Sequence, residues 1–235
     1  MSARVFDALI LRRVEYRDAD LILSLYTREA GKLRVIAPNA RSSRRRFVGG
    51  LDPMQRATMM IRVRETVSLQ RLEQSSLTEA FLSLREKLPR LEAAGALVTL
   101  LDRHLEEGSA DEALFDRAIR ALEEMMSRDG ARDIGLERDA FRLFFLERMG
   151  QAPVLDRCVE SSLEAPLDRP AFFDPRRGGV VSRRYGGGPY LLSPAARFFM
   201  SEALSSPSAP ALELSEDECE AIKRSIDAFF EAHFN

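Results

Sequence analysis

The chain has 235 residues, of which 45% are hydrophobic and 31% are charged, and its formal net charge is −2. This composition suits a globular protein with enough apolar mass for a core. No apolar run is long enough to span a membrane, and the first residues lack the apolar core of a signal peptide. Two cysteines cannot form a disulfide framework, so we expect a cytoplasmic protein.

The near-neutral total hides a division of charge along the chain. Residues 1–72 contain 15 Lys and Arg but only 7 Asp and Glu, a net charge of +8. Residues 73–235 contain 20 basic and 30 acidic residues, a net charge of −10. Such asymmetry indicates a polyanionic partner for the basic part. Because 14 of its 15 cations are arginine, which pairs with phosphates and stacks on bases, nucleic acid is favoured over simple solvation of a strand-rich surface.

The basic part of the chain has the side-chain pattern of β-strands. Apolar alternation and strand-forming residues predict strands over residues 4–14, 20–27, 32–37, 54–64 and 66–72. The short turn at 28–31 joins two of them as a hairpin. Five short strands in about 70 residues fit a small closed barrel of the OB type, which binds single strands through its exposed face and loops.

Helical periodicity begins at residue 76. Ser76 with Glu79, Ser109 with Glu112, and Ser215 with Glu218 are spaced as capping boxes. We expect helices over residues 77–88, 91–107, 110–128, 136–149, 194–204 and from 216 to near the end of the sequence. The fold class is therefore α+β, with expected domains at 1–75, 76–152, 153–190 and 191–235.

No pattern in the sequence predicts catalysis. The glycine runs at 178–179 and 186–188 lack the Gly-Lys-Ser/Thr ending of a phosphate-binding loop. His104 and His233 have no metal-ligand spacing around them, and neighbouring carboxylates such as Glu106 and Glu107 cannot share one helix face. We therefore expect a binding protein and no enzyme.

The most specific motifs lie in the first 47 residues. An arginine-bearing strand is followed by Tyr16–Asp20, an apolar strand, Thr27–Lys32 and a basic loop at Ala40–Arg46. In these motifs, and in the order of barrel, helical domain and small cysteine-bearing insert, the chain resembles the bacterial RecO family of DNA repair and recombination mediators.

The resemblance implies several functions and partners. Proteins of this family bind single- and double-stranded DNA and anneal complementary strands. They engage the acidic C-terminal tail of single-stranded-DNA-binding protein, and with RecR they help load recombinase onto DNA coated by that protein. For this chain, the resemblance thus implies a nucleoid-associated location in the cytoplasm.

RecO proteins often carry a zinc ribbon with two Cys-x2-Cys pairs. At the corresponding positions this chain has Cys158, Ser161, Ser182 and Tyr185. A structural zinc site needs four good nitrogen or sulfur donors, which one thiol and two hydroxyls of low acidity do not provide. We therefore expect a degenerate zinc-ribbon-like insert over residues 153–190 that binds no metal, and we expect no other cofactor.

Cations of the barrel are the expected DNA contacts. They are Arg28, Lys32, Arg34, Arg41, Arg44, Arg45, Arg46, Arg62 and Arg64. The four loop arginines within residues 41–46 are too closely spaced to be neutralised locally, and the others extend along neighbouring strands. Tyr16, Tyr26 and Phe47 are candidates for stacking on bases, with packing in the barrel core as the alternative for Tyr26.

Partner recruitment is assigned to the apolar helix at 136–149. By resemblance, Arg142 and Arg138 are candidates for binding the tail of single-stranded-DNA-binding protein. The alternative interpretation is that the phenylalanines of this helix are core and the arginines extend past them to solvent. Two other functions stay open for the chain as a whole: an OB-fold RNA-binding module, and an adaptor whose basic surface meets an acidic protein.

Overall fold

The computed structural model describes residues 3–43, 45–64 and 67–234. The chain forms two compact units, residues 1–126 and 127–235. In the first unit a β-barrel is followed by two long helices, and the second combines helices with a small sheet. The expected boundaries after residues 75, 152 and 190 divide the chain more finely and stay predictions.

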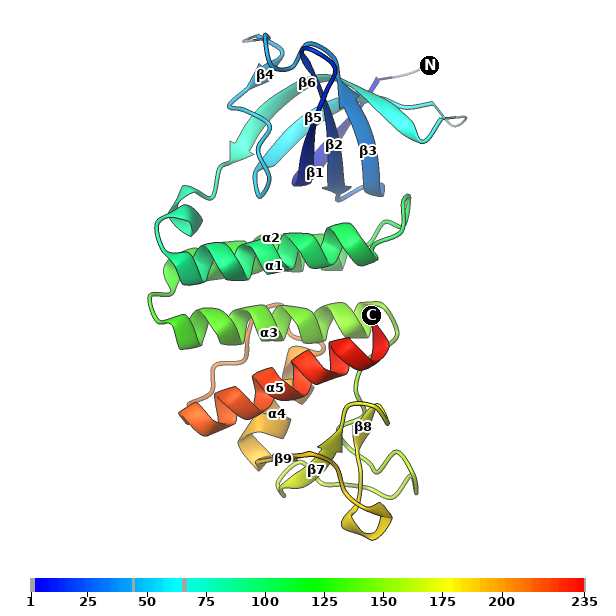
Figure 1. The fold of residues 1–235 in the computed structure, drawn as a ribbon, viewed down its shortest axis with the longest axis vertical. Helices are drawn as coiled ribbons and strands as arrows, with labels where there is room; N and C mark the ends of the chain where they lie inside the picture. Colours follow the sequence, from blue (N-terminus) through cyan, green and yellow to red (C-terminus); the bar gives the residue numbers. More distant parts are fainter. Residues whose placement is uncertain (1–2, 44, 65–66, 235) are drawn as a thin grey trace. The chain divides into compact units, whose positions relative to one another are not determined.

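Unit 1 opens with a closed barrel (Figure 1). Its strands are β1 Ala3–Tyr16, β2 Asp20–Thr27, β3 Gly31–Ala37, β4 Phe47–Val48, β5 Arg56–Arg62 and β6 Leu69–Glu79. They lie in the order β3-β2-β1-β5-β6-β4, and a parallel β3–β6 pairing closes the sheet. Alternate side chains such as Leu23, Val35 and Met59 fill the interior with no exposed surface. The expected α+β fold with an N-terminal OB-type barrel is thus confirmed.

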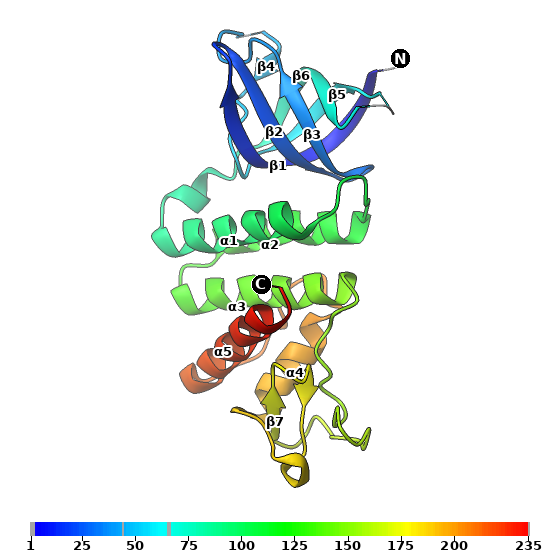
Figure 2. The same ribbon diagram turned by 45° about the vertical axis from the view of Figure 1, so that its right-hand side comes forward.

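Two helices complete unit 1, α1 Leu88–His104 and α2 Glu112–Ser127. They lie beside the end of the barrel where β2 turns into β3 (Figure 2). The Tyr26 ring on β2 packs 5.6 Å from the Phe115 ring on α2. The Tyr26 hydroxyl also donates to the Asp111 carbonyl at 2.9 Å. One end of the barrel is therefore covered by helices.

The predicted helix over residues 77–88 is wrong. Residues through Glu79 belong to β6, and only a short 3-10 turn, η1 Leu82–Arg85, precedes α1. Ser76 and Leu77 pair with Thr58 and Ala57 on β5. Pairing along the whole of β5 satisfies more backbone groups than a capped turn would, so the tertiary contact overrides the local capping signal. Helix α1 then begins three residues before the expected Leu91, with a proline in its first turn.

The cap of α2 also differs from the expected Ser109–Glu112 box. The helix begins at Glu112, and the Asp111 carboxylate accepts the Leu114 N–H at 3.0 Å. Asp111 therefore caps the helix. Between α1 and α2, the N–H of Gly108 donates to the carbonyl of Lys32 at 3.0 Å, so this loop is tied to the first residues of β3.

Unit 2 is built on helices α3 Ala131–Arg148, α4 Pro194–Ala203 and α5 Glu216–His233. Its core includes Leu143, Phe199 and Ile226, one from each helix. The expected caps are confirmed: the Ser193 hydroxyl accepts from Ala196 N–H, and Ser215 forms the capping box with Glu218. Helix α3 begins at Ala131, ahead of the expected residue 136, directly after Gly130.

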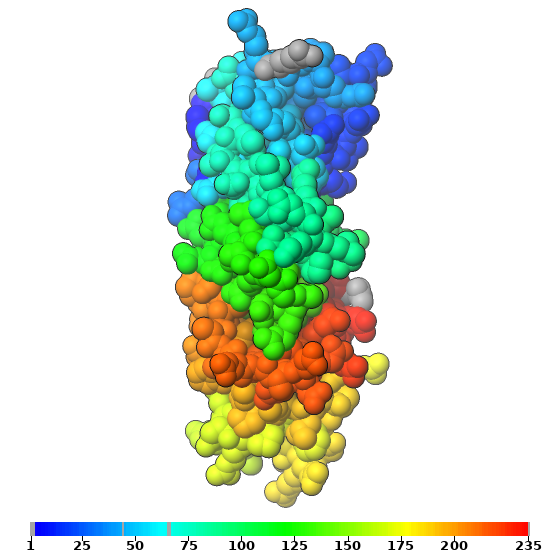
Figure 3. Space-filling model, turned by 90° about the vertical axis from the view of Figure 1, so that its left-hand side faces the viewer, coloured from blue at the N-terminus to red at the C-terminus, as the bar shows by residue number. Residues whose placement is uncertain are grey.

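The segment between α3 and α4 contains a small sheet. Its strands are β7 Ala171–Asp174, β8 Gly179–Val180 and β9 Tyr190–Leu192, in the order β8-β7-β9, with a 3-10 turn, η2 Arg183–Tyr185. In Figure 3 this segment is yellow, beside the orange to red of α4 and α5. Phe173 on β7 is fully buried in the core of unit 2, as expected for a segment held by packing. Over the described ranges, no helix has the length and apolarity needed to cross a membrane.

Candidate nucleic-acid interface

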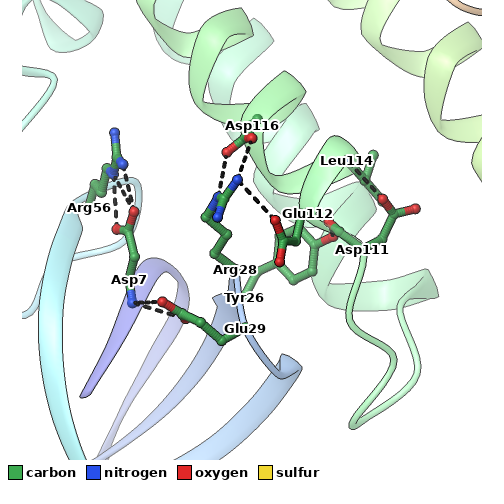
Figure 4. Close-up of polar contacts among 9 residues, drawn as sticks. All are labelled: Asp7, Tyr26, Arg28, Glu29, Arg56, Asp111, Glu112, Leu114 and Asp116. Carbon is green, nitrogen blue, oxygen red and sulfur yellow. Dashed lines mark hydrogen bonds and ion pairs between the residues drawn. The ribbon is translucent and has the colours of Figure 1, made fainter.

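The end of the barrel that faces α1 and α2 carries cations that the chain itself neutralises (Figure 4). Arg28, in the β2–β3 turn, donates two hydrogen bonds of 3.0 Å to Asp116 and lies 3.0 Å from a Glu112 oxygen. The hydrogen bonds that Arg28 donates to Asp116, together with the negative charge of Asp116, raise the pKa of Arg28. Nearby, Arg56 on β5 pairs with Asp7 at 2.6 Å. Neither guanidinium is left open for a phosphate.

Lys32, on β3, is engaged still more deeply. Its Nζ donates to the backbone carbonyls of Asp102 and Leu105, at the end of α1, and lies 3.7 Å from the Asp102 carboxylate. A cation in this place satisfies carbonyls that have no partner within the helix and complements the negative end of the helix dipole. Asp102 also accepts from Ser24 on β2 at 2.5 Å and pairs with Arg12 on β1 at 2.9 Å. It therefore joins three strands to α1.

A glycine allows this close approach. Gly31 has a φ of +66°, and a Cβ added there would lie 2.1 Å from the Ser109 carbonyl oxygen. Any side chain at this position would force the β2–β3 turn away from the α1–α2 loop. Lys32 is thus shielded from a nucleic acid where the backbones of the strand turn and the helix loop meet, whereas the more exposed Arg28 is neutralised by Asp116 and Glu112.

At the opposite end of the barrel, the turn between β1 and β2 meets the loop between β3 and β4. The Arg41 N–H donates to the Ala19 carbonyl at 3.0 Å, and the Asn39 N–H donates to the Asp20 carboxylate at 2.8 Å. These bonds fix the two segments side by side. We call this region, residues 16–20 and 38–46, the loop end of the barrel.

The loop end displays cations in different states. Arg45 is exposed and has no hydrogen-bond or ion-pair partner within the described ranges. Arg46 stacks 5.0 Å above the Phe47 ring and donates to the Pro38 carbonyl at 2.5 Å, so its charge is positioned without being neutralised. Arg41 pairs with Glu15 at 3.2 Å, in an exposed and therefore weak ion pair. Arg44 lies outside the described residues.

A second group of cations surrounds the hairpin between β5 and β6. Arg62 and Arg71 share a single carboxylate, that of Glu73, at 3.1 and 3.5 Å. Arg64 is exposed and, among the residues described, no contact satisfies its guanidinium. The backbone of Arg34 on β3 pairs in register with Leu69 on β6, beside the hairpin. Its side chain is exposed, and its guanidinium too has no partner in the described chain.

The two groups are connected along the seam where β3 and β6 pair. Ile36 pairs with Arg71 in register, and further along β6 the Ser75 N–H donates to the Arg46 carbonyl at 2.8 Å. Outward cations therefore follow one seam from the β5–β6 hairpin to the loop end. We call them the seam cations; they are Arg34, Arg45, Arg46, Arg62, Arg64 and Arg71.

Two cations on or near this surface are absent from the expected DNA contacts. Arg71 is one of them, and its register with Arg62 and Ile36 places it on the outer face. Arg17 was also passed over, although it lies in the β1–β2 turn with its guanidinium 5.1 Å from the Tyr16 ring. Outward alternation along β6 was the signal that could have identified Arg71.

The three aromatic candidates occupy different environments. Tyr26 is fully buried against α2, and Phe47 is buried in the barrel core, so neither face is open for a base. Tyr16 is 38% exposed at the loop end, beneath Arg17. Of these three, Tyr16 alone is positioned for base stacking.

In unit 2, both candidate arginines of α3 are held by carboxylates. Arg138 donates two hydrogen bonds of 3.0 Å to Asp139, and Arg142 donates to Asp227 at 2.6 Å while lying 4.4 Å from the Phe230 ring. Burial raises the pKa of Asp139, and the two arginines oppose that effect. Arg138 nevertheless lines a cleft of about 470 Å³ between the first halves of α3 and α5, whereas Arg142 does not.

Two turns lie at the positions expected for a degenerate zinc ribbon. The Ser162 N–H donates to the Cys158 carbonyl at 2.8 Å, and the Tyr185 N–H donates to the Ser182 carbonyl at 2.8 Å. The Ser182 N–H lies 3.3 Å from Cys158 Sγ, so the two turns face each other. Burial opposes ionisation of Cys158, but hydrogen bonds from Ser161 and from backbone amides outweigh it and lower the thiol pKa to about 7. One thiol beside serines does not fit a structural zinc ion, and the residues described contain no cluster of three or more His, Cys, Asp or Glu arranged to hold a metal.

Similarity to known proteins extends over nearly the whole chain. Residues 1–81 match the family model "Recombination protein O N terminal", and residues 85–235 match "Recombination protein O C terminal". The DNA repair protein RecO of Koribacter versatilis is 31% identical over 175 residues, 74% of this chain and 69% of that protein. The protein of the same name from Rubrobacter xylanophilus is 33% identical over 175 residues, 74% of this chain and 68% of that protein. The one from Myxococcus xanthus is 34% identical over 181 residues, 77% of this chain and 71% of that protein.

Proposed function

Because the chain belongs to the RecO family of DNA repair and recombination proteins, we propose that its barrel binds single- and double-stranded DNA along the seam cations. The observation that carries the proposal is the exposure of Arg34, Arg45 and Arg64, whose guanidinium groups have no partner in the described residues. OB barrels bind strands across the outer face and loops of their middle strands. Here α1 and α2 cover the half of that face near the β2–β3 turn, so DNA would follow the other half.

Salt dependence tests this binding mode. If about five cations neutralise phosphates, log affinity should fall with log salt with a slope of about −3.5 for single strands. Fluorescence anisotropy with single-stranded DNA, duplex DNA and RNA of one sequence would measure it. A slope near zero would contradict a phosphate-binding barrel. A preference for RNA over both DNA forms would contradict the DNA assignment and support the RNA-binding alternative.

Strand annealing is the proposed activity of the bound state. Arginines can screen the phosphates of two strands while their base edges stay free to pair. Changing Arg41, Arg44, Arg45 and Arg46 to alanine should therefore slow annealing of complementary oligonucleotides. The matched control changes four exposed arginines of unit 2 to alanine: Arg157, Arg176, Arg184 and Arg224. Both variants lose the same charge, so equal annealing rates would mean that the loop has no specific role.

We assign the tail of single-stranded-DNA-binding protein to the cleft between α3 and α5. Arg138 and Arg132 line its α3 side, and Leu136 offers an apolar contact. The opposite side carries Glu216 and Glu220 from α5, which would hold an acidic tail toward α3. Binding of a labelled tail peptide should weaken in Arg132→Ala and Arg138→Ala but not in Arg184→Ala, at an exposed position of η2 outside the cleft. Equal binding by all three would refute this cleft.

The remaining partners follow from the family. We propose that the chain acts with RecR to load recombinase onto DNA coated by single-stranded-DNA-binding protein. Recombinase filament formation on coated DNA, with and without RecR, measures this role. Acceleration should require both proteins, and filament formation that is unaffected by this chain would contradict the proposal.

A further inference from the structure

A buried arginine of α4 contacts the segment expected to form a degenerate ribbon. Arg197 on α4 has no exposed surface, and its guanidinium faces a segment, residues 155–169, that forms neither helix nor strand. Its Nη1 donates to the carbonyls of Pro166 and Arg169 at 2.6 and 2.5 Å. Its Nη2 donates to the carbonyls of Leu155 and Ala165 at 2.5 and 2.6 Å. Four loop carbonyls thus converge on one side chain.

This arrangement supplies hydrogen-bond donors to backbone carbonyls of the segment. A loop without regular structure leaves buried backbone carbonyls that need donors. A guanidinium has its donors in a fixed planar fork, so it can bind several carbonyls at once and hold them at set positions. The side chain has no carboxylate within ion-pair distance among the described residues; its charge is balanced at longer range by Asp156 and Asp168. Burial accordingly lowers the pKa of Arg197.

The same segment carries the first of the two facing turns. Cys158 lies in the first turn and Ser182 in the second, with the Ser182 N–H against Cys158 Sγ. In a zinc ribbon, four thiolates and a metal join such turns. Here three of those four donors are missing, yet the turns face each other, so other interactions must fix the loop that contains the first turn.

We propose that Arg197 takes the structural place of a metal ion, closing residues 155–169 onto α4 in a ribbon that needs no zinc. The loop is held from its base, at the four carbonyls, and not from the tips of its turns. The proposal is independent of DNA binding by the barrel, because it concerns contacts within unit 2 alone.

Limited trypsin digestion tests the clamp. Arg157, which precedes Cys158, is an exposed cleavage site within the loop, whereas Arg169 precedes Pro170 and resists trypsin. Arg197→Met keeps an unbranched apolar side chain but removes every donor, and it should speed cleavage at Arg157 by at least about tenfold. Arg197→Lys, which keeps the charge and up to three donors, should give an intermediate rate. Arg224→Met, at an exposed position of α5, is the control and should cleave as the wild type does.

Metal analysis supplies a second measurement, which for the wild-type chain does not depend on how well the variants fold. The wild-type chain should retain no stoichiometric zinc after purification in zinc-containing buffer. The triple variant Ser161→Cys, Ser182→Cys, Tyr185→Cys should bind one zinc ion and, when combined with Arg197→Met, should regain protection from trypsin only when zinc is present. Stoichiometric zinc in the wild type would overturn the proposal. Unchanged cleavage in Arg197→Met, or no zinc binding by the triple variant, would also overturn it.

Discussion

Both ends of the barrel carry cations in their turns, but these cations lie in opposite environments. At the β2–β3 turn Arg28 and Lys32 bond with groups of α1 and α2, whereas at the loop end Arg45 is exposed and its guanidinium has no partner in the described chain. The difference comes from the helices, whose carboxylates Asp102 and Asp116 reach only one end. Local cation density therefore does not identify a binding surface; the position of the chain's own anions does.

Basic residues therefore have different roles in the two regions. Cations at the helix-facing end act within the fold, where they are partly desolvated and bonded to fixed acceptors. Cations along the seam remain hydrated, and their interaction with phosphate gains from release of counterions. Substitutions at the first set should change stability without changing DNA affinity, and substitutions at the second should do the reverse.

The largest expected effect is at Asp102, which joins Arg12, Ser24 and Lys32 to α1. Asp102→Ala leaves Lys32, only 14% exposed, without its carboxylate. We expect a loss of about 2–3 kcal/mol in the free energy of unfolding. Urea denaturation measures it. Asp102→Asn keeps an acceptor for the Ser24 hydroxyl, so it should lose less of the free energy of unfolding. An equal loss in the two variants would show that the Asp102 charge alone accounts for the stabilisation.

The next effect concerns the open cations. Changing Arg34, Arg45 and Arg64 together to alanine should weaken single-strand binding by about 10- to 100-fold at low salt and reduce the salt slope by about 2. The free energy of unfolding should stay within about 0.5 kcal/mol of wild type, because none of the three guanidinium groups has a partner in the described residues.

Arg28→Ala is the counterpart of this triple variant at the other end of the barrel. It should destabilise the chain, because Asp116 and Glu112 lose their partner, and leave the salt slope unchanged. Anisotropy titrations at several salt concentrations provide the comparison. A steep loss of DNA affinity in Arg28→Ala would mean that the helices release this end when DNA binds.

A smaller effect separates the aromatic residues. Tyr16→Ala should weaken binding of a single strand by about 1 kcal/mol through loss of one stacked base, with little change in stability. Tyr26→Phe removes the hydrogen bond to the Asp111 carbonyl and should cost about 1 kcal/mol of stability without affecting DNA binding. Quenching of tyrosine fluorescence by DNA should persist in Tyr26→Phe and be reduced in Tyr16→Ala. The reverse result would place the strand on the helix-covered face.

Much of the fold could be predicted because a strand or helix that buries one face has apolar residues at regular intervals in its sequence. Strand β2 was predicted with its observed bounds, since Leu21, Leu23 and Leu25 alternate toward the core. The terminal helix was predicted by the box at Ser215 and Glu218. The failure at residues 77–88 has the opposite cause. The capping signal at Ser76 was real locally, but β5 needed a partner along its whole length.

The candidate site was less predictable, because its electrostatics depend on residues distant in sequence. Arg28 and its partner Asp116 are 88 positions apart, and Lys32 is 70 positions from Asp102. Composition correctly located the excess of cations in the barrel but could not show which of them meet the acids of α1 and α2. That distinction requires the topology that brings the β2–β3 turn to the helices.

The smallest effect is the pH dependence of the Arg28–Asp116 pair. The hydrogen bond from Arg28, and then its charge, hold the pKa of Asp116 below its usual value of 3.8. A carboxyl with a lowered pKa in the folded chain adds stability that is complete above the unfolded pKa and is lost as pH falls through the folded pKa. Asp116→Asn should therefore destabilise the chain near neutral pH, and the difference from wild type should shrink as the pH falls below about 4.

Salt distinguishes this pair from the Lys32 contact at the same end of the barrel. Arg28 and Asp116 are 38% and 56% exposed, so added salt should screen their attraction. Lys32 and Asp102 are 14% and 15% exposed, and bonds from Lys32 to helix carbonyls accompany the ion pair. Urea denaturation of Asp116→Asn and Asp102→Ala at low and high salt should show a difference from wild type that fades for the first variant and persists for the second. If both differences faded equally, the helix-facing end would be as open to solvent as the seam, and the contrast between the two ends would not hold.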